Sequence, residues 1–236
     1  MITGLAFMAF VAASTAGLSM MAVREHRSAL KLRHGLLNSA AGLLTDARIS
    51  IARDQFPVLM GRLADQRQIR IELVADTLVF RRLPQLWLKI TLIERREVRR
   101  PTIGALARPT GAEFYSLVHD LPQWIEPPQT GTSLLMRGDG SASGWQIERV
   151  AATFRTLFAD PTVKEAAITP RGVRLIRQAS QGDRGAHLIL RQTRFPVAEI
   201  SADLVRKAIA EAETLSETLR ETPCEETNVV PFKLSA

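Results

Sequence analysis

The first 23 residues, from Met1 to Val23, contain no charged side chain. A helix of that length spans about 34 Å at about 1.5 Å per residue, and the hydrocarbon core of a bilayer is about 30 Å thick. An uncharged segment of this length can therefore cross a bilayer. We therefore predict a transmembrane anchor at residues 1–23, followed by a soluble domain.

The charges that follow this segment predict its orientation. The flank contains six basic or imidazole side chains and Glu25 as its only acid: Arg24, His26, Arg27, Lys31, Arg33 and His34. Basic flanks stay in the cytoplasm, whereas a secretory signal carries its basic residues before the apolar segment. We expect a single-pass protein of the bacterial cytoplasmic (inner) membrane, with its N-terminus outside and its C-terminal domain in the cytoplasm. The small residues at 12–16 leave a cleaved export signal as the alternative.

The composition agrees with a reducing compartment. Cys224 is the only cysteine, so no intramolecular disulfide is possible. The net charge of +7 comes from 31 basic residues against 24 acidic ones. Arginine supplies most of the basic residues, which indicates phosphate or lipid contacts or simply a GC-rich genome.

The chain divides into four predicted regions. These are the anchor at 1–23, a basic juxtamembrane helix and connector at 24–46, a cytoplasmic domain at 47–221 with a possible sub-boundary near 130–145, and a flexible tail at 222–236. The domain is long enough to bury its own core.

Periodicity predicts an α+β domain of antiparallel sheet with two main α-helices. Short apolar and β-branched runs near 47–75 predict a meander, and residues 83–94 predict a central strand because both of its faces carry apolar side chains. Residues 95–131 contain five prolines and predict a covering loop. Helical spacing predicts helices near 145–158 and from Ser201 to about Arg220, and hairpin strands are expected within 164–195, with turns at 170–172 and 181–185.

One segment, "RGDGSASG" at 137–144, has the order strand, glycine-rich loop, helix that binds nucleotide phosphates. Its glycines, Gly138, Gly140 and Gly144, give the spacing GxGxxxG rather than GxGxxG, and no P-loop lysine follows. We interpret it as a surface loop and keep nucleotide binding as an alternative.

A second segment, "EFYSLVHD" at 113–120, brings acid, hydroxyl and imidazole groups together in the sequence. A nucleophile and a base are conceivable there, but no nucleophile elbow surrounds Ser116. The four histidines are scattered, so the spacing predicts no metal site, and we expect no cofactor.

Two segments are strongly basic. Residues 81–108 and 170–195 are rich in arginine, whereas 196–226 is acidic. Three interpretations compete: neutralisation by the acidic C-terminal helix, contact with anionic lipid headgroups, and nucleic-acid binding. We place neutralisation first and expect no specific nucleic acid, because no recognisable binding motif is present.

Small residues recur at every fourth position of the predicted anchor, at Ala9, Ala13 and Gly17. This spacing lets a second membrane helix approach closely. We therefore expect the anchor to pack against an integral membrane protein or against a second copy, with Arg24, Arg27, Lys31 and Arg33 contacting lipid.

Together these features predict a membrane-anchored, non-enzymatic interaction protein that serves as an accessory, assembly or scaffolding subunit of a membrane complex. The alternatives are a tethered enzyme or nucleotide-binding protein that uses 138–144 or 113–120, and a regulatory module that senses lipid or another ligand.

Overall fold

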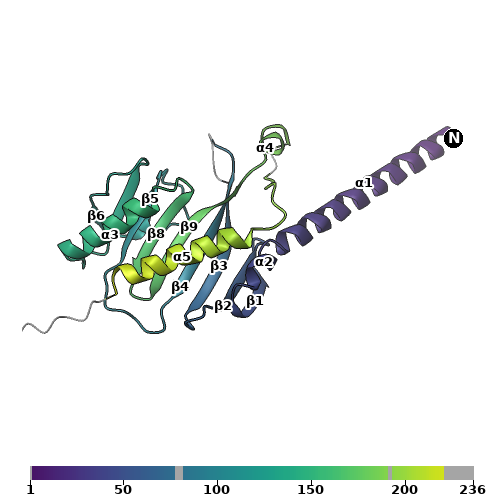
Figure 1. Cartoon of the computed structure of the whole chain (residues 1–236). Helices are drawn as coiled ribbons and strands as arrows, with labels where there is room; N and C mark the ends of the chain where they lie inside the picture. The colour runs from purple at the N-terminus through teal and green to yellow at the C-terminus, as the bar shows by residue number, and fades with distance from the viewer. Residues whose placement is uncertain (1, 78–81, 191–192, 221–236) are drawn as a thin grey trace, which may run out of the picture.

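A nine-stranded antiparallel sheet forms the centre of the domain (Figure 1). The computed structural model describes residues 2–77, 82–190 and 193–220, so the predicted tail at 222–236 lies outside the described residues. The strand order is β1-β2-β3-β4-β9-β8-β5-β7-β6. The strands are β1 (Thr45–Ile51), β2 (Pro57–Arg62), β3 (Gln68–Asp76), β4 (Gln85–Ile93), β5 (Ile103–Ala107), β6 (Gln123–Ile125), β7 (Leu134–Gly138), β8 (Val163–Thr169) and β9 (Gly172–Gln181).

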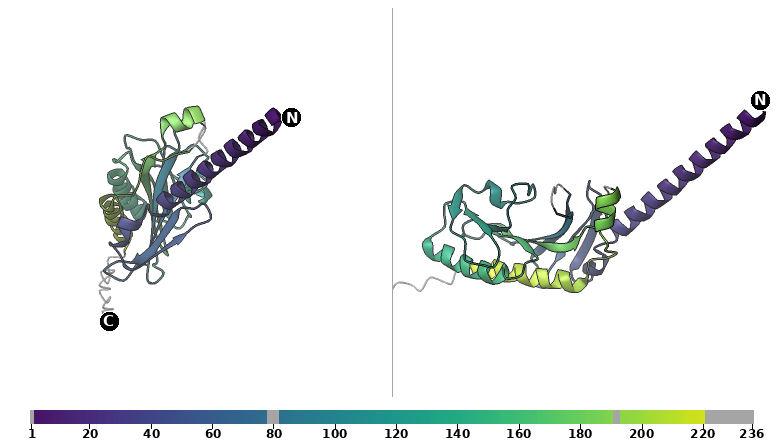
Figure 2. Two further views of the ribbon diagram at one scale, coloured as in Figure 1. Left: turned by 90° about the vertical axis from the view of Figure 1, so that its right-hand side faces the viewer. Right: turned by 90° about the horizontal axis from the view of Figure 1, so that it is seen from above.

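The helices are α1 (Ile2–His34), α2 (Asn38–Ala41), α3 (Gly144–Leu157), α4 (Arg184–Leu190) and α5 (Ala202–Thr218), with a short 3₁₀ turn η1 (Val118–Asp120). Helices α3 and α5 lie along one face of the sheet, whereas α1 extends away from the domain (Figure 2). Helix α5 packs across β4 and β9, and α3 packs against β5. The predicted α+β class, with an antiparallel sheet and two main helices in the domain, is confirmed.

Strand register puts the core on the helix-covered face. One row of directly paired residues crosses seven strands and is fully buried throughout: Leu59, Ile71, Ile90, Leu175, Ala166, Ala105 and Met136. Because side chains alternate between faces along a strand, the intervening residues point to the face without α3 and α5. We call this second side the helix-free face.

Both predicted domain helices are present and capped. Ser201 accepts a hydrogen bond from the Leu204 N–H at the start of α5, and Ser143 forms a capping box with Gln146 at the start of α3. The apolar side of α5, including Val205, Ala208 and Leu215, is buried against the sheet.

The prediction of a strand after the turn at 181–185 is wrong. Residues 184–190 form helix α4, and Asp183 starts it by accepting the Ala186 N–H at 2.6 Å. The physical reason lies in the sheet order, because β9 is already paired with β4 on one side and β8 on the other. No edge remains beside β9 for a hairpin partner.

Acidic side chains of α5 neutralise arginines of the sheet. Arg177 donates to Glu211 at 2.6 Å and to Asp160 at 2.8 Å, and the side chain of Arg177 is 3% exposed. Arg100 donates to Glu94 and to the Ser216 carbonyl oxygen. For Arg177 the expected neutralisation by the acidic C-terminal helix is confirmed, whereas the acidic partner of Arg100 is Glu94, which follows β4. Arg95, Arg96 and Arg99 are exposed and form no ion pair with any described residue.

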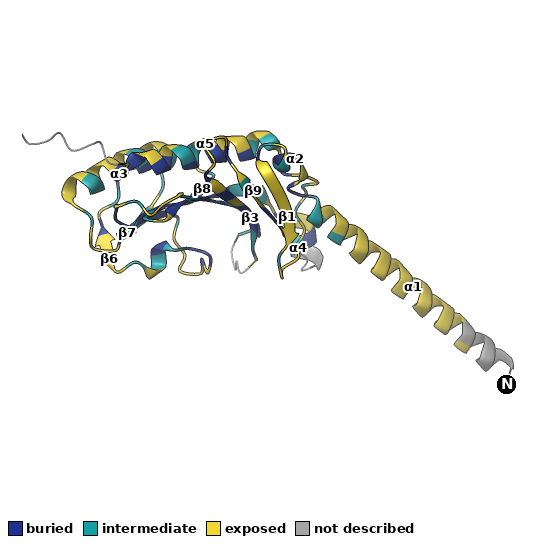
Figure 3. Ribbon diagram, turned by 90° about the horizontal axis from the view of Figure 1, so that it is seen from below, coloured by how far each residue is buried: buried dark blue, intermediate teal, exposed yellow. Residues whose placement is uncertain are grey.

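Helix α1 leaves the domain as one continuous rod of 33 residues (Figures 1 and 3). Within the described part of the chain, no helix combines the length with the apolar composition that a bilayer crossing requires. The anchor at 1–23 therefore stays a prediction.

The contact between Arg177 and α5 yields a stability prediction. Replacing Arg177 with alanine leaves two carboxylates without their buried partner, so we expect the free energy of unfolding to fall by about 3 kcal/mol. Arg206→Ala is the matched control, because Arg206 and its partner Asp203 are 60% and 88% exposed. That change should cost under about 1 kcal/mol. Chemical denaturation followed by circular dichroism measures both, and equal costs would contradict the assignment.

Candidate functional site

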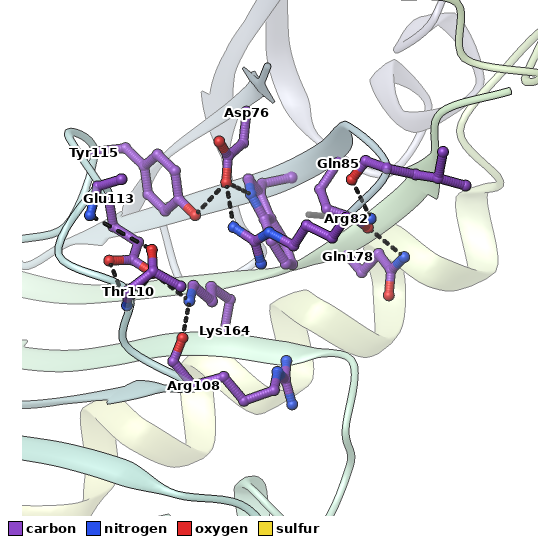
Figure 4. Close-up of polar contacts among 12 residues, drawn as sticks. Asp76, Arg82, Gln85, Arg108, Thr110, Glu113, Tyr115, Lys164 and Gln178 are labelled. Carbon is purple, nitrogen blue, oxygen red and sulfur yellow. Dashed lines mark hydrogen bonds and ion pairs between the residues drawn. The ribbon is translucent and has the colours of Figure 1, made fainter. Parts of the chain in front are cut away.

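The helix-free face carries a buried cluster of charged side chains where the segment 108–121 covers the sheet (Figures 2 and 4). This segment lies close because β5 has Gly104 beneath it, where an added Cβ would meet Val118 Cγ2 at 2.9 Å. We call Asp76, Arg82, Arg108, Glu113 and Lys164 the charged cluster. Asp76, Glu113 and Lys164 are buried and Arg82 and Arg108 are partly buried, and we take this group of charges as our candidate site.

Asp76, the last residue of β3, is one centre of the charged cluster. Its Oδ2 accepts hydrogen bonds from Arg82 Nη2 at 2.9 Å, Tyr115 OH at 3.3 Å and Trp87 Nε1 at 3.4 Å. Burial and the negative charge of Asp76 raise the pKa of Tyr115 well above its usual value. Tyr115 therefore stays protonated and acts as a fixed donor rather than as a base.

Lys164 and Glu113 form the second centre. Lys164 Nζ donates to Glu113 Oε1 at 2.8 Å and to the carbonyl oxygens of Ala107 and Arg108 at 2.8 and 3.0 Å. Glu113 also accepts from the backbone and hydroxyl of Thr110 and from the Gly111 N–H. Both side chains are almost completely buried.

Electrostatics keep this pair ionised. Burial alone would raise the pKa of Glu113, but hydrogen bonds and the positive charge of Lys164 outweigh it and hold the pKa at about 2. Burial lowers the pKa of Lys164, and Glu113 opposes that shift. Each charge stabilises the other, so the pair ties segment 108–121 to β8.

Arg108 has an unusual backbone conformation, with φ of +48°. A non-glycine residue in this left-handed region costs on the order of 1 kcal/mol, so its surroundings must impose it. The Arg108 N–H donates to the Ser133 carbonyl oxygen at 2.8 Å, and the Arg108 carbonyl oxygen accepts from Lys164. The backbone on both sides of this residue is thus held in place.

The fold brings only some of the polar side chains of the segment 113–120 into contact with one another. His119 Nε2 lies 3.2 Å from Glu113 Oε2, but Tyr115 points to Asp76. Ser116 Oγ accepts the Val118 N–H at 3.1 Å and so starts the turn η1, while Asp120 is exposed. No hydrogen bond joins Ser116 to His119 among the described residues, and this geometry favours a structural role over a nucleophile and base.

Asp139 organises the loop 138–144. Asp139 accepts the Thr102 N–H at 2.7 Å, and it also accepts the Ser141 N–H and hydroxyl. The preceding strand β7 pairs antiparallel with both β5 and β6. Because the Asp139 carboxylate lies within the loop and accepts the Ser141 N–H, and because the topology is not a parallel βαβ unit, the arrangement does not favour a bound phosphate.

The residues predicted for membrane contact lie on α1. Ala13 and Gly17 are exposed, whereas the side chain of Ala9 is outside the described ones. Arg24, Arg27 and Lys31 are also exposed. Arg33 differs, because its guanidinium lies 4.8 Å from the centre of the Phe56 ring and packs α1 against the domain.

The sequence analysis placed Glu113 in the segment 113–120 and Arg82 and Arg108 in the basic segment 81–108, but it did not single out Asp76 or Lys164 and did not bring the five together. A weak signal existed in "VKEAAIT" at 163–169, where Lys164 and Glu165 interrupt an apolar strand. Among the described residues, no group of His, Cys, Asp and Glu side chains is arranged to hold a metal ion. Cys224 lies outside the described residues.

Comparison of the chain with protein-family models, with curated proteins and with solved structures finds no match in any of the three. The functional argument therefore depends on the chain's own geometry.

The Glu113 and Lys164 pair yields a prediction for paired variants. Glu113→Gln and Lys164→Met should each lower the free energy of unfolding by about 3–5 kcal/mol, because each leaves a buried charge without its partner. The double variant should lose less than the sum of the two. Additive costs in denaturant unfolding would contradict a direct coupling.

The same pair predicts how stability depends on pH. A carboxyl whose folded pKa is about 2 contributes stability above its unfolded pKa, near 4.5, and loses that contribution as the pH falls toward 2. The stability difference between the wild type and Glu113→Gln should therefore be constant above about pH 5 and shrink below it. Thermal unfolding at pH values from 7 to 3 measures this, and an unchanged difference at pH 3 would contradict the assignment.

Proposed function

We propose that this chain is a membrane-anchored, non-enzymatic interaction protein whose α+β domain serves as an accessory, assembly or scaffolding subunit of a membrane complex. The observation that carries the proposal is the exposed apolar surface of α1 (Figure 3). Five of its large apolar side chains are 69–77% exposed: Met8, Phe10, Leu18, Met20 and Met21. Apolar surface of this kind needs lipid or another protein to cover it.

The division of charge along α1 supports the membrane as the covering medium. The uncharged residues 1–23 are followed by the exposed side chains of Arg24, Arg27 and Lys31. Basic residues at this position favour anionic headgroups on the cytoplasmic side, each by about 1 kcal/mol. We therefore propose that the N-terminus is outside the cytoplasmic membrane and that the domain is in the cytoplasm.

The base of α1 offers a contact surface beside the proposed membrane. A cavity of about 560 Å³ lies between α1 and the segment 193–197, and Ala29, Leu32, Phe195 and Val197 contribute to its apolar lining. Glu25 accepts a hydrogen bond from Arg194 at 2.7 Å across this region. The location suits a neighbouring subunit that contacts both the helix and the domain.

The hydrogen bonds of the helix-free face support a binding role over an enzymatic one. The carboxylates of Glu72, Asp76 and Glu113 are engaged in ion pairs or hydrogen bonds with donors from β4, β8 and segment 108–121. Ser116 and Tyr115 are used as fixed structural partners. Such a surface is held rigid, which favours recognition by shape and charge.

Reporter fusions test the proposed topology. A reporter active only in the cytoplasm, fused after Ala236, should be active, and one active only in the periplasm should be inactive, because the basic flank retains the domain inside. Cell fractionation should place the fusion in the membrane pellet after a salt wash. A soluble fusion, or the opposite reporter pattern, would overturn the proposal.

A double substitution tests whether α1 contacts a partner. Ala13→Leu with Gly17→Leu raises hydrophobicity, so insertion should persist, while the added bulk should block close helix packing. We expect loss of partners that co-purify in mild detergent, or loss of crosslinking between copies. Ser19→Leu, about 200° around the helix from Gly17, is the control and should retain both.

Unchanged co-purification and crosslinking in the double variant would show that the small residues of α1 are not an interface. The topology result is independent of this outcome, since a helix can anchor without a helical partner.

A further inference from the structure

A second cavity lies on the helix-free face, beside the base of α1. Its volume is about 610 Å³, which is within the range of pockets that hold small molecules. Parts of the chain that are far apart in the sequence line it: the last turn of α1, the connection between β1 and β2, strands β3 and β4, the segment 108–121, and residues 193–195. The cavity is therefore formed by the fold as a whole and not by a single loop.

Four aromatic side chains line this cavity, which we call the aromatic cavity: Phe56, Phe114, Tyr115 and Phe195. Phe114 and Tyr115 pack edge to face with their ring centres 5.3 Å apart, and the Tyr115 hydroxyl donates to Asp76 (Figure 4). Phe114 is nevertheless 66% exposed. An exposed phenylalanine beside a cavity lined by other rings is a surface that a flat apolar molecule can cover.

A small buried cluster supports the apolar lining. Val74 packs against Trp87, Tyr115 and Ile176, and the last three of these are buried. Val74 and Tyr115 also line the aromatic cavity. Part of its wall is thus held by packing inside the domain, so its shape does not depend on surface side chains alone.

Arg33 supplies the aromatic cavity with a cation that has no acidic partner among the described residues. Its guanidinium lies over the Phe56 ring, 4.8 Å from the ring centre, and Phe56 is only 5% exposed. A guanidinium over a ring keeps the N–H donors at its edge for a bidentate contact with a carboxylate. The buried ring therefore positions the cation and leaves its donors available to a ligand.

The other charges around the aromatic cavity also leave it positive. Lys89 pairs with Glu72 at 2.8 Å, and Glu72 is shared with Arg70 at 2.7 Å. Asp54, which is exposed, is the only acid among the lining residues. Three cations, including Arg33, thus face two carboxylates, and this balance favours a negatively charged ligand.

We propose that the aromatic cavity binds a small aromatic carboxylate. Its flat body would lie against Phe114 and Phe195, and its carboxylate would accept hydrogen bonds from the Arg33 guanidinium. An apolar lining with a few polar groups that fix the orientation of the ligand is the usual composition of a small-molecule site. The site lies on the domain and on the last turn of α1, so it does not depend on residues 1–23 crossing a membrane.

Calorimetric titration of the full chain in nanodiscs of neutral phosphatidylcholine tests this site, with empty nanodiscs as the reference for partitioning into lipid. The probes are naphthoate, the uncharged alcohol naphthylmethanol, and decanoate, which carries the same carboxylate on a flexible chain. We expect saturable binding of naphthoate, at least about 10-fold tighter than that of either other probe, because only naphthoate combines the rings with the charge.

Substitution of Arg33 tests the charged contact. Arg33→Gln should weaken the affinity for naphthoate at least about 10-fold, since a charge-assisted bidentate contact is lost. Arg33→Lys should bind with an intermediate affinity, because an ammonium keeps the charge but cannot make the bidentate contact. Arg27→Gln is the matched control and should bind like the wild type, since Arg27 is an exposed cation of the same helix that does not line the aromatic cavity.

Substitution of Phe114 tests the aromatic wall. Phe114→Ala should fold like the wild type, because the ring is largely exposed, and should weaken naphthoate binding by about 3–10-fold. Trp124→Ala is the matched control, since Trp124 is 62% exposed and does not line the aromatic cavity. The proposal is overturned if naphthoate gives no more heat than with empty nanodiscs, if naphthylmethanol or decanoate binds as tightly as naphthoate, or if either Arg33→Gln or Phe114→Ala binds naphthoate like the wild type.

Discussion

The buried ammonium group of Lys164 is the contact on which the helix-free face depends. Its three acceptors are two backbone carbonyl oxygens at the end of β5 and the Glu113 carboxylate of the covering segment. Once the covering segment has removed this ammonium from water, leaving it unpaired would cost several kcal/mol. The segment therefore has to place Glu113 against Lys164, which fixes its position on the sheet.

The two faces of the sheet are stabilised by different interactions, although one strand register positions the side chains of both. On one face, alternate residues such as Ile71, Ile90 and Leu175 are covered by α5 and need only apolar contact. On the other, Glu72 pairs with Lys89 at 2.8 Å, and Asp76 collects donors from three segments. Specific pairing of charges and the covering segment 108–121 there take the place of a layer of helices.

Periodicity was sufficient to predict the class of the fold and most of its elements. The meander through 83–94, the two main helices and the turn at 170–172 follow from local patterns of apolar residues, caps and turn residues. The prediction of a strand after Gln181 was wrong because strand pairing depends on residues far apart in the sequence. The segment "AHLIL" has the apolar content of either a strand or a helix. Only the sheet order, with β9 enclosed on both sides, decides between them.

The candidate site was harder to predict from the sequence than the fold. Asp76, Arg108 and Lys164 are separated by dozens of residues, and each is an ordinary charged residue in its local context. Their significance comes from burial and from the left-handed backbone at Arg108, neither of which a local pattern encodes. The segment 113–120 was recognised as unusual, but its Glu113 serves Lys164 rather than a reacting group.

The junction between α1 and the domain has a mechanical consequence. Only Gly35 separates the helix from Leu36 and Leu37, which are buried in the core, and Arg33 packs on Phe56 just before that point. In the anchored arrangement that we propose, α1 would act as a rigid spacer, so the depth and rotation of the helix in a bilayer would determine which side of the domain faces the membrane. Each residue inserted between 24 and 34 would turn the domain by about 100° and displace it by about 1.5 Å. The length of this spacer is therefore as much a determinant of orientation as any contact on the domain surface.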